Sequence, residues 1–115
     1  ILVFLLHDPL LSNPTRQQEI CGRWAHNGLN EFFAQGEKEK ELSLPVSPLC
    51  DTQTTKTADS QIGFLQFVVR PAYVLLGDIV PKVKEELLPI IDENLEYWET
   101  LKRRESFQKK QEQLK

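Results

Sequence analysis

The spacing of apolar residues limits this chain of 115 residues to one fold class. In the segment 83–101, apolar residues recur every three or four positions with glutamate and lysine between them, at Val83, Leu87, Ile91, Leu95, Trp98 and Leu101. This period is that of an amphipathic helix. The sequence has no alternating strand pattern, β-hairpin signal or internal repeat. It therefore predicts an all-α fold.

A first helix is predicted over residues 15–35. Asn13 and Pro14 mark its start, with Ser12 or Asn13 as the N-cap, because proline suits the first turn of a helix. Gly36 is predicted to end it. The apolar side chains of this helix fall near one face and are Ile20, Trp24, Leu29, Phe32 and Phe33.

The segment 42–57 differs from its neighbours because it is rich in proline, serine and threonine. This composition predicts a loop, with a short solvated helix over 37–41 before it. Val46, Leu49 and Cys50 lie inside the segment, so we expect the loop to pack against the rest of the protein.

Two further helices are expected in the second half of the chain. The helix over 58–79 has apolar residues almost all round its axis, so we expect it to be substantially buried, with a bend at Pro71. The amphipathic helix that follows Pro81 is expected to be interrupted near Pro89.

Charge is spread unevenly along the chain, whose formal net charge is −3. Residues 101–115 carry a net charge of +4, so the first 100 residues carry −7. An acidic body argues against a nucleic-acid surface. We expect residues 101–115 to form a charged C-terminal helical extension, solvated or fraying, with contact to an anionic partner as the alternative.

No membrane span or export signal is predicted. The longest apolar run covers residues 1–6, against about 20 residues for a bilayer crossing, and it lacks the flanks of a signal peptide. Cys21 and Cys50 form no Cys-x-x-Cys motif, which argues against a zinc knuckle or redox site, and reduced cysteines favour a cytoplasmic location. Because the chain lacks methionine and begins with apolar residues, we expect a piece of a longer protein cut inside a buried element.

General catalytic motifs are absent from the sequence. It has no P-loop, no Gly-x-Gly-x-x-Gly, no His-Glu-x-x-His and no Gly-x-Ser-x-Gly. The two histidines, His7 and His26, lie on different predicted elements, which argues against a shared metal site. General motifs therefore indicate only a helical domain.

Five short motifs occur in a fixed order along residues 5–64. They are Leu5-Leu6-His7 with Ser12-Asn13-Pro14, Trp24 with Glu31-Phe32-Phe33, Gln35-Gly36 with Glu37-Lys38-Glu39, Leu44-Pro45 with Ser47-Pro48-Leu49-Cys50-Asp51, and Ser60-Gln61-Ile62-Gly63-Phe64. In this order and spacing they resemble the catalytic domain of class I 3′,5′-cyclic-nucleotide phosphodiesterases.

The resemblance implies that residues 1–100 are the C-terminal third of a helical domain that hydrolyses cyclic AMP or cyclic GMP to the 5′-monophosphate. In the complete domain, zinc and magnesium ions stabilise the attacking and leaving oxygens. Most of their ligands lie upstream, so we expect no metal site, no catalytic residue and no turnover in this chain alone. The expected partners are the cyclic nucleotide and the missing N-terminal part of the domain.

Three residues match the nucleotide site of the family. Gln61 matches the glutamine that anchors the purine, since an amide both donates and accepts hydrogen bonds. Phe64, three residues later on the same helix face, matches the aromatic residue that stacks on the purine. Asn13 matches a residue at the edge of the site, with the N-cap role as its alternative.

The sequence also departs from the family pattern. Leu10 stands where the family has a metal-binding aspartate, and Asp8 lies two residues too early. Gly28 replaces the aliphatic residue opposite the stacking phenylalanine, and Cys21 replaces a pocket tyrosine. For Leu10, the unbroken match from Ser12 onward favours a misread or spliced sequence over residues 1–11, an explanation that does not extend to Gly28. The departures also leave open a non-catalytic relative with a nucleotide-binding or protein-interaction role. A third hypothesis is a structural helical module that uses the stripe over 87–101 to bind a partner, although packing within the chain is favoured.

Overall fold

The computed structural model describes residues 11–114. In chain order the elements are a 3₁₀ turn η2 (Asn13–Thr15), α2 (Gln18–Glu41), α3 (Thr57–Phe64), a π-helical segment η3 (Leu65–Val69), α4 (Arg70–Ile79), α5 (Pro81–Glu86) and α6 (Leu88–Gln113). Residues 11–114 contain no strand, which confirms the predicted all-α fold.

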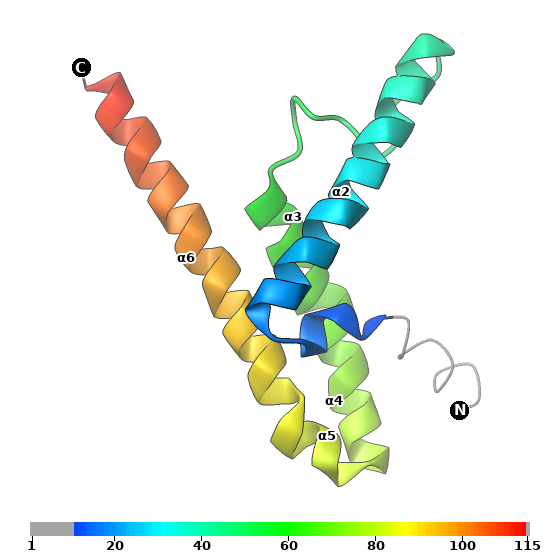
Figure 1. Ribbon diagram of the computed structural model, residues 1–115, viewed down its shortest axis with the longest axis vertical. Helices are drawn as coiled ribbons and strands as arrows, with labels where there is room; N and C mark the ends of the chain where they lie inside the picture. Colours follow the sequence, from blue (N-terminus) through cyan, green and yellow to red (C-terminus); the bar gives the residue numbers. More distant parts are fainter. Residues whose placement is uncertain (1–10, 115) are drawn as a thin grey trace.

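The core lies where the rod formed by α3, η3 and α4 packs against α5 and α6. Its buried residues are Ala58, Leu65, Val69, Tyr73, Val83, Ile91 and Trp98. Figure 1 shows α2 and α6 diverging upward with α3 between them, while α4 and α5 form the lower end of the molecule. The apolar stripe of α6 is therefore used for packing within the chain, as the sequence favoured.

The N-terminal half of the fold differs from the prediction at both ends of α2. Asn13 and Pro14 form the separate turn η2 rather than the start of the helix, and α2 begins at Gln18. Its other end lies beyond Gly36, at Glu41. Gly36 does not stop the helix because its missing side chain admits the backbone of Cys50, whose carbonyl a Cβ at this position would overlap.

The loop between α2 and α3 packs against α2, as expected. Cys50 is buried, while Leu49 takes a left-handed backbone conformation with φ of 65°. The segment 37–41 is the last part of α2 rather than a separate helix.

The bend that the sequence predicts at Pro71 stays a prediction, but the rod over 57–79 contains a π-helical segment just before this proline. Proline has no N–H to donate and its ring crowds the preceding turn. The π-helical segment η3 ends at Val69, immediately before the first turn of α4 that contains Pro71. Pro89 likewise lies in the first turn of α6, after a break at Leu87, which confirms the interruption that the sequence placed near this proline.

The predicted burial of the same rod is wrong for one of its faces. Leu65 and Val69 are buried in the core, but Phe67 is 79% exposed and Leu75 is 58% exposed. The α6 helix covers one side only, and within residues 11–114 no helix covers the other.

The apolar rod also bears on the predicted absence of a membrane span. Thr57–Ile79 is 23 residues long and apolar enough to cross a membrane by length and composition alone, which the survey of continuous apolar runs overlooked. A core helix passes the same test, and Leu65 and Val69 do lie in the core. The absence of a span stays a prediction.

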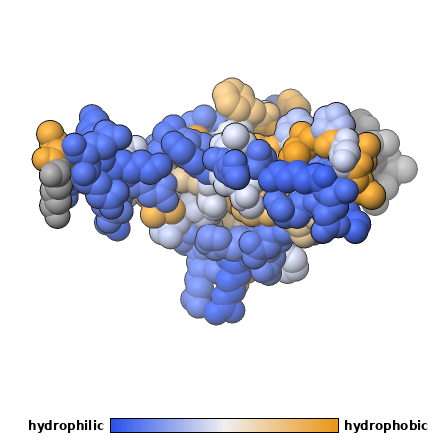
Figure 2. Space-filling model, turned by 90° about the horizontal axis from the view of Figure 1, so that it is seen from above, coloured by the Kyte–Doolittle hydropathy of each residue, from blue (hydrophilic) through white to orange (hydrophobic). Residues whose placement is uncertain are grey.

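The basic end of α6 is helical and exposed. Residues 102–114 are all exposed, and Lys102 pairs with Asp59 at 2.7 Å between Nζ and Oδ1. Figure 2 shows this projecting end as mostly hydrophilic with apolar atoms at its tip, and Phe107 and Leu114 are its exposed apolar side chains. The expected solvated helix is thus present, while a domain boundary near residue 101 stays a prediction, since α6 crosses it without a break.

Candidate functional site

A pocket of about 350 Å³ opens between η2, α2, α3 and the loop that joins the two helices. Its lining residues are Leu11, Asn13, Pro14, Cys21, Trp24, Ala25, Gly28, Leu29, Phe32, Leu49, Ser60, Gln61 and Phe64. The three residues that the sequence singled out, Asn13, Gln61 and Phe64, therefore meet in one cavity.

Gln61 and Phe64 project into the pocket from adjacent turns of α3. Their spacing of three residues places them on one helix face. Gln61 is half-buried, and within the described residues its amide forms no hydrogen bond. The amide is therefore available to pair with a ligand beside the ring of Phe64.

Asn13 reaches the pocket from η2 and is not an N-cap. Ser12 precedes the turn and makes no side-chain capping bond, and α2 starts after Gln17. The turn is instead held by Asn94 of α6, whose Nδ2 donates to the carbonyl oxygens of Pro14 and Arg16, each at 2.8 Å.

Asn94 was missed by the sequence analysis. It is only 2% exposed and lies on the apolar face of α6 between Ile91 and Trp98. A lone amide in an apolar stripe was the available signal, because a buried polar side chain needs a partner.

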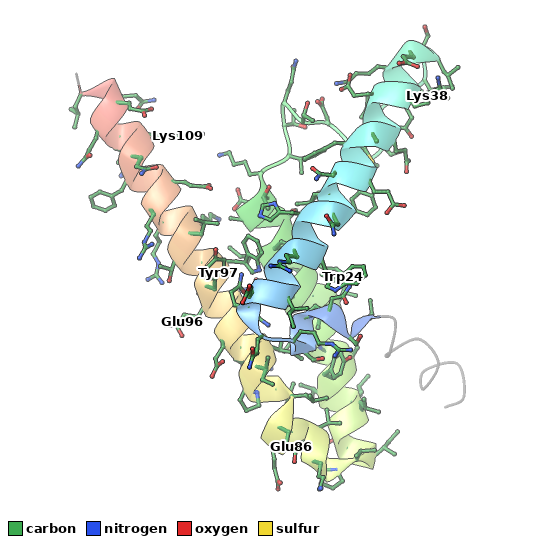
Figure 3. The ribbon with its side chains drawn as sticks, viewed as in Figure 1. Trp24, Lys38, Glu86, Glu96, Tyr97 and Lys109 are labelled. Carbon is green, nitrogen blue, oxygen red and sulfur yellow. The ribbon has the colours of Figure 1, made fainter. Side chains whose placement is uncertain are left out.

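The wall formed by α2 alternates large and small side chains. Trp24 and Phe32, which the sequence placed on one helix face, are 55% and 44% exposed and line the pocket. In Figure 3 Trp24 projects from the lower part of α2 beside η2. Between them, a Cβ at Gly28 would meet no atom within 4 Å.

The pocket carries no charged side chain among its lining residues. Cys21 is its most acidic group, and burial raises the pKa of this thiol above its ordinary value, so the thiol stays protonated at neutral pH. A neutral, largely apolar cavity with two amides suits a planar heterocycle better than a phosphate.

The described residues do not fit a metal site. Within residues 11–114, no group of three or more histidine, cysteine, aspartate and glutamate side chains is placed to hold an ion. His26 is exposed, with its ring edge-on to Trp98 at 6.4 Å between centroids. The predictions about the metal site that involve His7, Asp8 and Leu10 concern residues outside the part of the chain that the structure describes.

Fold and pocket together define a helical domain with one uncharged, largely apolar cavity. Comparison with known proteins narrows this class. The family model described as 3′5′-cyclic nucleotide phosphodiesterase matches residues 1–90. The chain belongs to this family.

Relatives and solved structures agree with the assignment. The chain is 41% identical over 105 residues to mouse dual specificity calcium/calmodulin-dependent 3′,5′-cyclic nucleotide phosphodiesterase 1C, covering 91% of this chain and 14% of the mouse protein. It is 48% identical over 81 residues to the bovine 1B protein of the same description, covering 70% of this chain and 15% of that protein.

Among solved structures, the phosphodiesterase domain of Salpingoeca rosetta rhodopsin phosphodiesterase superposes with a TM-score of 0.81 at 35% identity. That match covers 97% of this chain and 33% of the other. LmjPDEB1 in complex with IBMX gives a TM-score of 0.77 at 26% identity, covering 85% of this chain and 30% of the other.

Proposed function

We propose that this chain is part of a metal-dependent hydrolase that converts cyclic AMP, cyclic GMP or both to the 5′-monophosphate in cytoplasmic second-messenger signalling. Its share of the work is to supply the purine pocket. The observation that supports this most directly is that Gln61, Phe64 and Asn13 line one uncharged cavity. Membership of the phosphodiesterase family supports the reaction class.

Each pocket residue has a role that follows from its chemistry. The Gln61 amide can donate to and accept from the edge of either purine, because its orientation can reverse. The Phe64 ring offers a stacking face, which in nucleic-acid complexes contributes about 1–3 kcal/mol per base. Asn13 contributes a second amide at the rim, held in place by Asn94 through the backbone of η2.

Zinc and magnesium belong to the complete domain in this proposal. The described residues of this chain assemble no ligand set for them, so no step of hydrolysis is assigned to these residues. Their part is to bind the base and to orient it. By itself the chain should therefore release no 5′-monophosphate above a protein-free blank.

Calorimetric titration of the chain with cyclic AMP and with cyclic GMP tests the pocket. Gln61→Ala should weaken binding about tenfold or more, because it removes the amide that pairs with the base. Gln66→Ala is the matched control, since this exposed glutamine lies on the same rod outside the pocket. If both variants lose affinity equally, or if neither loses affinity, Gln61 is not the residue that anchors the base.

A second candidate is a non-catalytic relative that binds nucleotide without turnover. The open pocket wall at Gly28 favours this non-catalytic relative. A purine stacked on Phe64 would gain no side-chain contact from Gly28 on its other face. Binding and product release measured on one sample of a longer protein containing this chain separate the two. Binding with product supports the hydrolase, and binding without product supports the relative.

A further inference from the structure

A hydrogen-bonded clasp joins the loop after α2 to the last turns of that helix. Both carboxylate oxygens of Glu39 accept bonds from Ser47. The Ser47 backbone N–H donates at 2.8 Å and its hydroxyl donates at 2.5 Å. Gln35 Nε2 also donates to this carboxylate, at 3.2 Å. The Glu39 carboxylate therefore fixes both the backbone and the side chain of Ser47.

The clasp lies close to two other features of the loop. Three residues beyond Ser47, the buried Cys50 packs its backbone against Gly36 of α2. Between them, Leu49 contributes to the wall of the pocket. Release of Ser47 would therefore expose Cys50 and remove part of that wall.

Among residues 11–114, the charges around the clasp leave no unpaired cation beside Ser47. Its hydrogen bonds lower the pKa of Glu39, so this carboxylate is ionised at neutral pH. Lys40 pairs with Glu37 at 2.9 Å and Asp51 at 3.4 Å. Lys38 pairs with Glu41 at 2.7 Å. A second negative group on Ser47 would thus face Glu39 uncompensated.

Ser47 is followed by Pro48, and no other serine or threonine in the chain precedes a proline. Pro45, Pro48 and Leu49 around it are exposed. A serine before proline in an exposed loop is the substrate type of proline-directed protein kinases. We propose that Ser47 is a phosphorylation site of such a kinase and that its phosphorylation releases the loop from α2.

The chemistry of the step balances with ATP as the co-reactant. The Ser47 hydroxyl oxygen bonds to the γ-phosphorus, the bond from that phosphorus to the β–γ bridging oxygen breaks, and ADP leaves. The hydroxyl proton passes to the base of the kinase. The product carries close to two negative charges at pH 7, and it replaces a hydrogen-bond donor to Glu39 by a like charge.

The reactivity of the Cys50 thiol provides a readout that needs no binding of cyclic nucleotide. Burial is the main cause of the raised pKa of its thiol, and a protonated, buried thiol reacts slowly. In a Cys21→Ala background, phosphorylation with a purified proline-directed serine/threonine kinase and ATP should add one phosphate at Ser47, located by peptide mass spectrometry. The alkylation rate of Cys50 should then rise about tenfold or more.

Charge variants separate repulsion from mere loss of the hydroxyl. Ser47→Ala keeps the backbone N–H bond to Glu39, so Cys50 should stay protected. Ser47→Asp should expose Cys50, and adding Glu39→Gln should restore its protection, because the opposing charge is gone.

Two results would overturn the proposal: no phosphate at Ser47, or equal Cys50 rates in Ser47→Asp with and without Glu39→Gln. Only the consequence for the pocket wall rests on the proposed function. If the chain binds no cyclic nucleotide, the change in the alkylation rate of Cys50 still tests the release of the loop. If that rate does not change, the proposed nucleotide pocket is unaffected.

Discussion

Gly28 and Gly36 lie two turns apart in α2 and are surrounded differently. At Gly36 a Cβ would overlap the carbonyl of Cys50, so only glycine lets the loop approach the helix. At Gly28 a Cβ would meet no atom within 4 Å, and the residue faces the pocket. The first glycine is required by packing, while the second leaves space in the ligand site.

The two glycines should therefore respond oppositely to alanine. Gly28→Ala should stabilise the chain by about 0.5–1 kcal/mol, because alanine loses less conformational entropy in a helix. Gly36→Ala should destabilise it by about 1–3 kcal/mol through overpacking. Thermal unfolding of both variants measures the two changes in stability. A Gly36→Ala variant that is more stable than the wild type would contradict the packing of Cys50 against Gly36.

Asn94 should matter more for stability than its position on α6 suggests. Asn94→Leu removes both donated hydrogen bonds and leaves the buried carbonyl group of Pro14 and the partly buried carbonyl group of Arg16 without a donor from α6. We expect a loss of about 1–3 kcal/mol in the free energy of unfolding, measured by urea denaturation. The exposed Gln111→Ala on the same helix is the control and should change the free energy by less than about 0.5 kcal/mol.

The clasp between α2 and the loop should depend on pH. The backbone N–H bond from Ser47 is the main cause of the lowered pKa of Glu39. A group with a lowered folded-state pKa stabilises the fold at neutral pH, and this contribution is lost as pH falls through that pKa. The NMR signal of the Ser47 amide should therefore titrate with a midpoint below 4.5, the ordinary glutamate value. A midpoint at or above that value, or the same titration in Glu39→Gln, would contradict the clasp.

The exposed end of α6 should be dispensable for folding. Its residues beyond Arg104 are exposed and lie outside the core. A chain ending at Arg104 should keep its unfolding free energy within about 0.5 kcal/mol, as measured by chemical denaturation. A chain ending at Glu96 is the control and should not fold, because it loses Trp98, which is 1% exposed in the core. A large loss in the first truncation would assign residues 105–115 a structural role.

Most helices could be predicted because apolar period and proline position are local properties. The π-helical segment before Pro71 and the break before Pro89 follow from the missing N–H of proline. The continuation of α2 through Gly36 was not predictable, since it depends on a contact with Cys50, 14 positions away in the sequence. From the sequence alone, a glycine that ends a helix cannot be distinguished from one, such as Gly36, that lies inside a helix and makes room for the backbone of a neighbouring segment.

The pocket was predictable in part, through the family motifs rather than through residue pattern. Gln61 and Phe64 were placed together by their helical spacing, but the arrival of Asn13 depends on the long-range bonds from Asn94. Apolar spacing placed Trp24 and Phe32 on one face of the helix but could not show what covers that face. In this chain, that face borders the cavity.

The chain spans 14% of the length of the mouse 1C relative and 33% of the structural neighbour from Salpingoeca rosetta. This partial coverage agrees with the proposal that the chain supplies only one part of the active site. Its described residues line one uncharged pocket and contain no group of three or more side chains placed to hold a metal ion. Binding of the base and chemistry at phosphorus are thus assigned to different parts of the phosphodiesterase domain in our proposal.

A map of where cyclic nucleotide binds the wild-type chain tests the central claim most directly. In a two-dimensional ¹H–¹⁵N NMR titration with cyclic AMP or cyclic GMP, the side-chain amides of Gln61 and Asn13 and the indole N–H of Trp24 should shift together and saturate. The indole of Trp98 and the amides of 105–113 should not. Shifts confined to that basic end, or no saturable change at the pocket, would contradict the assignment.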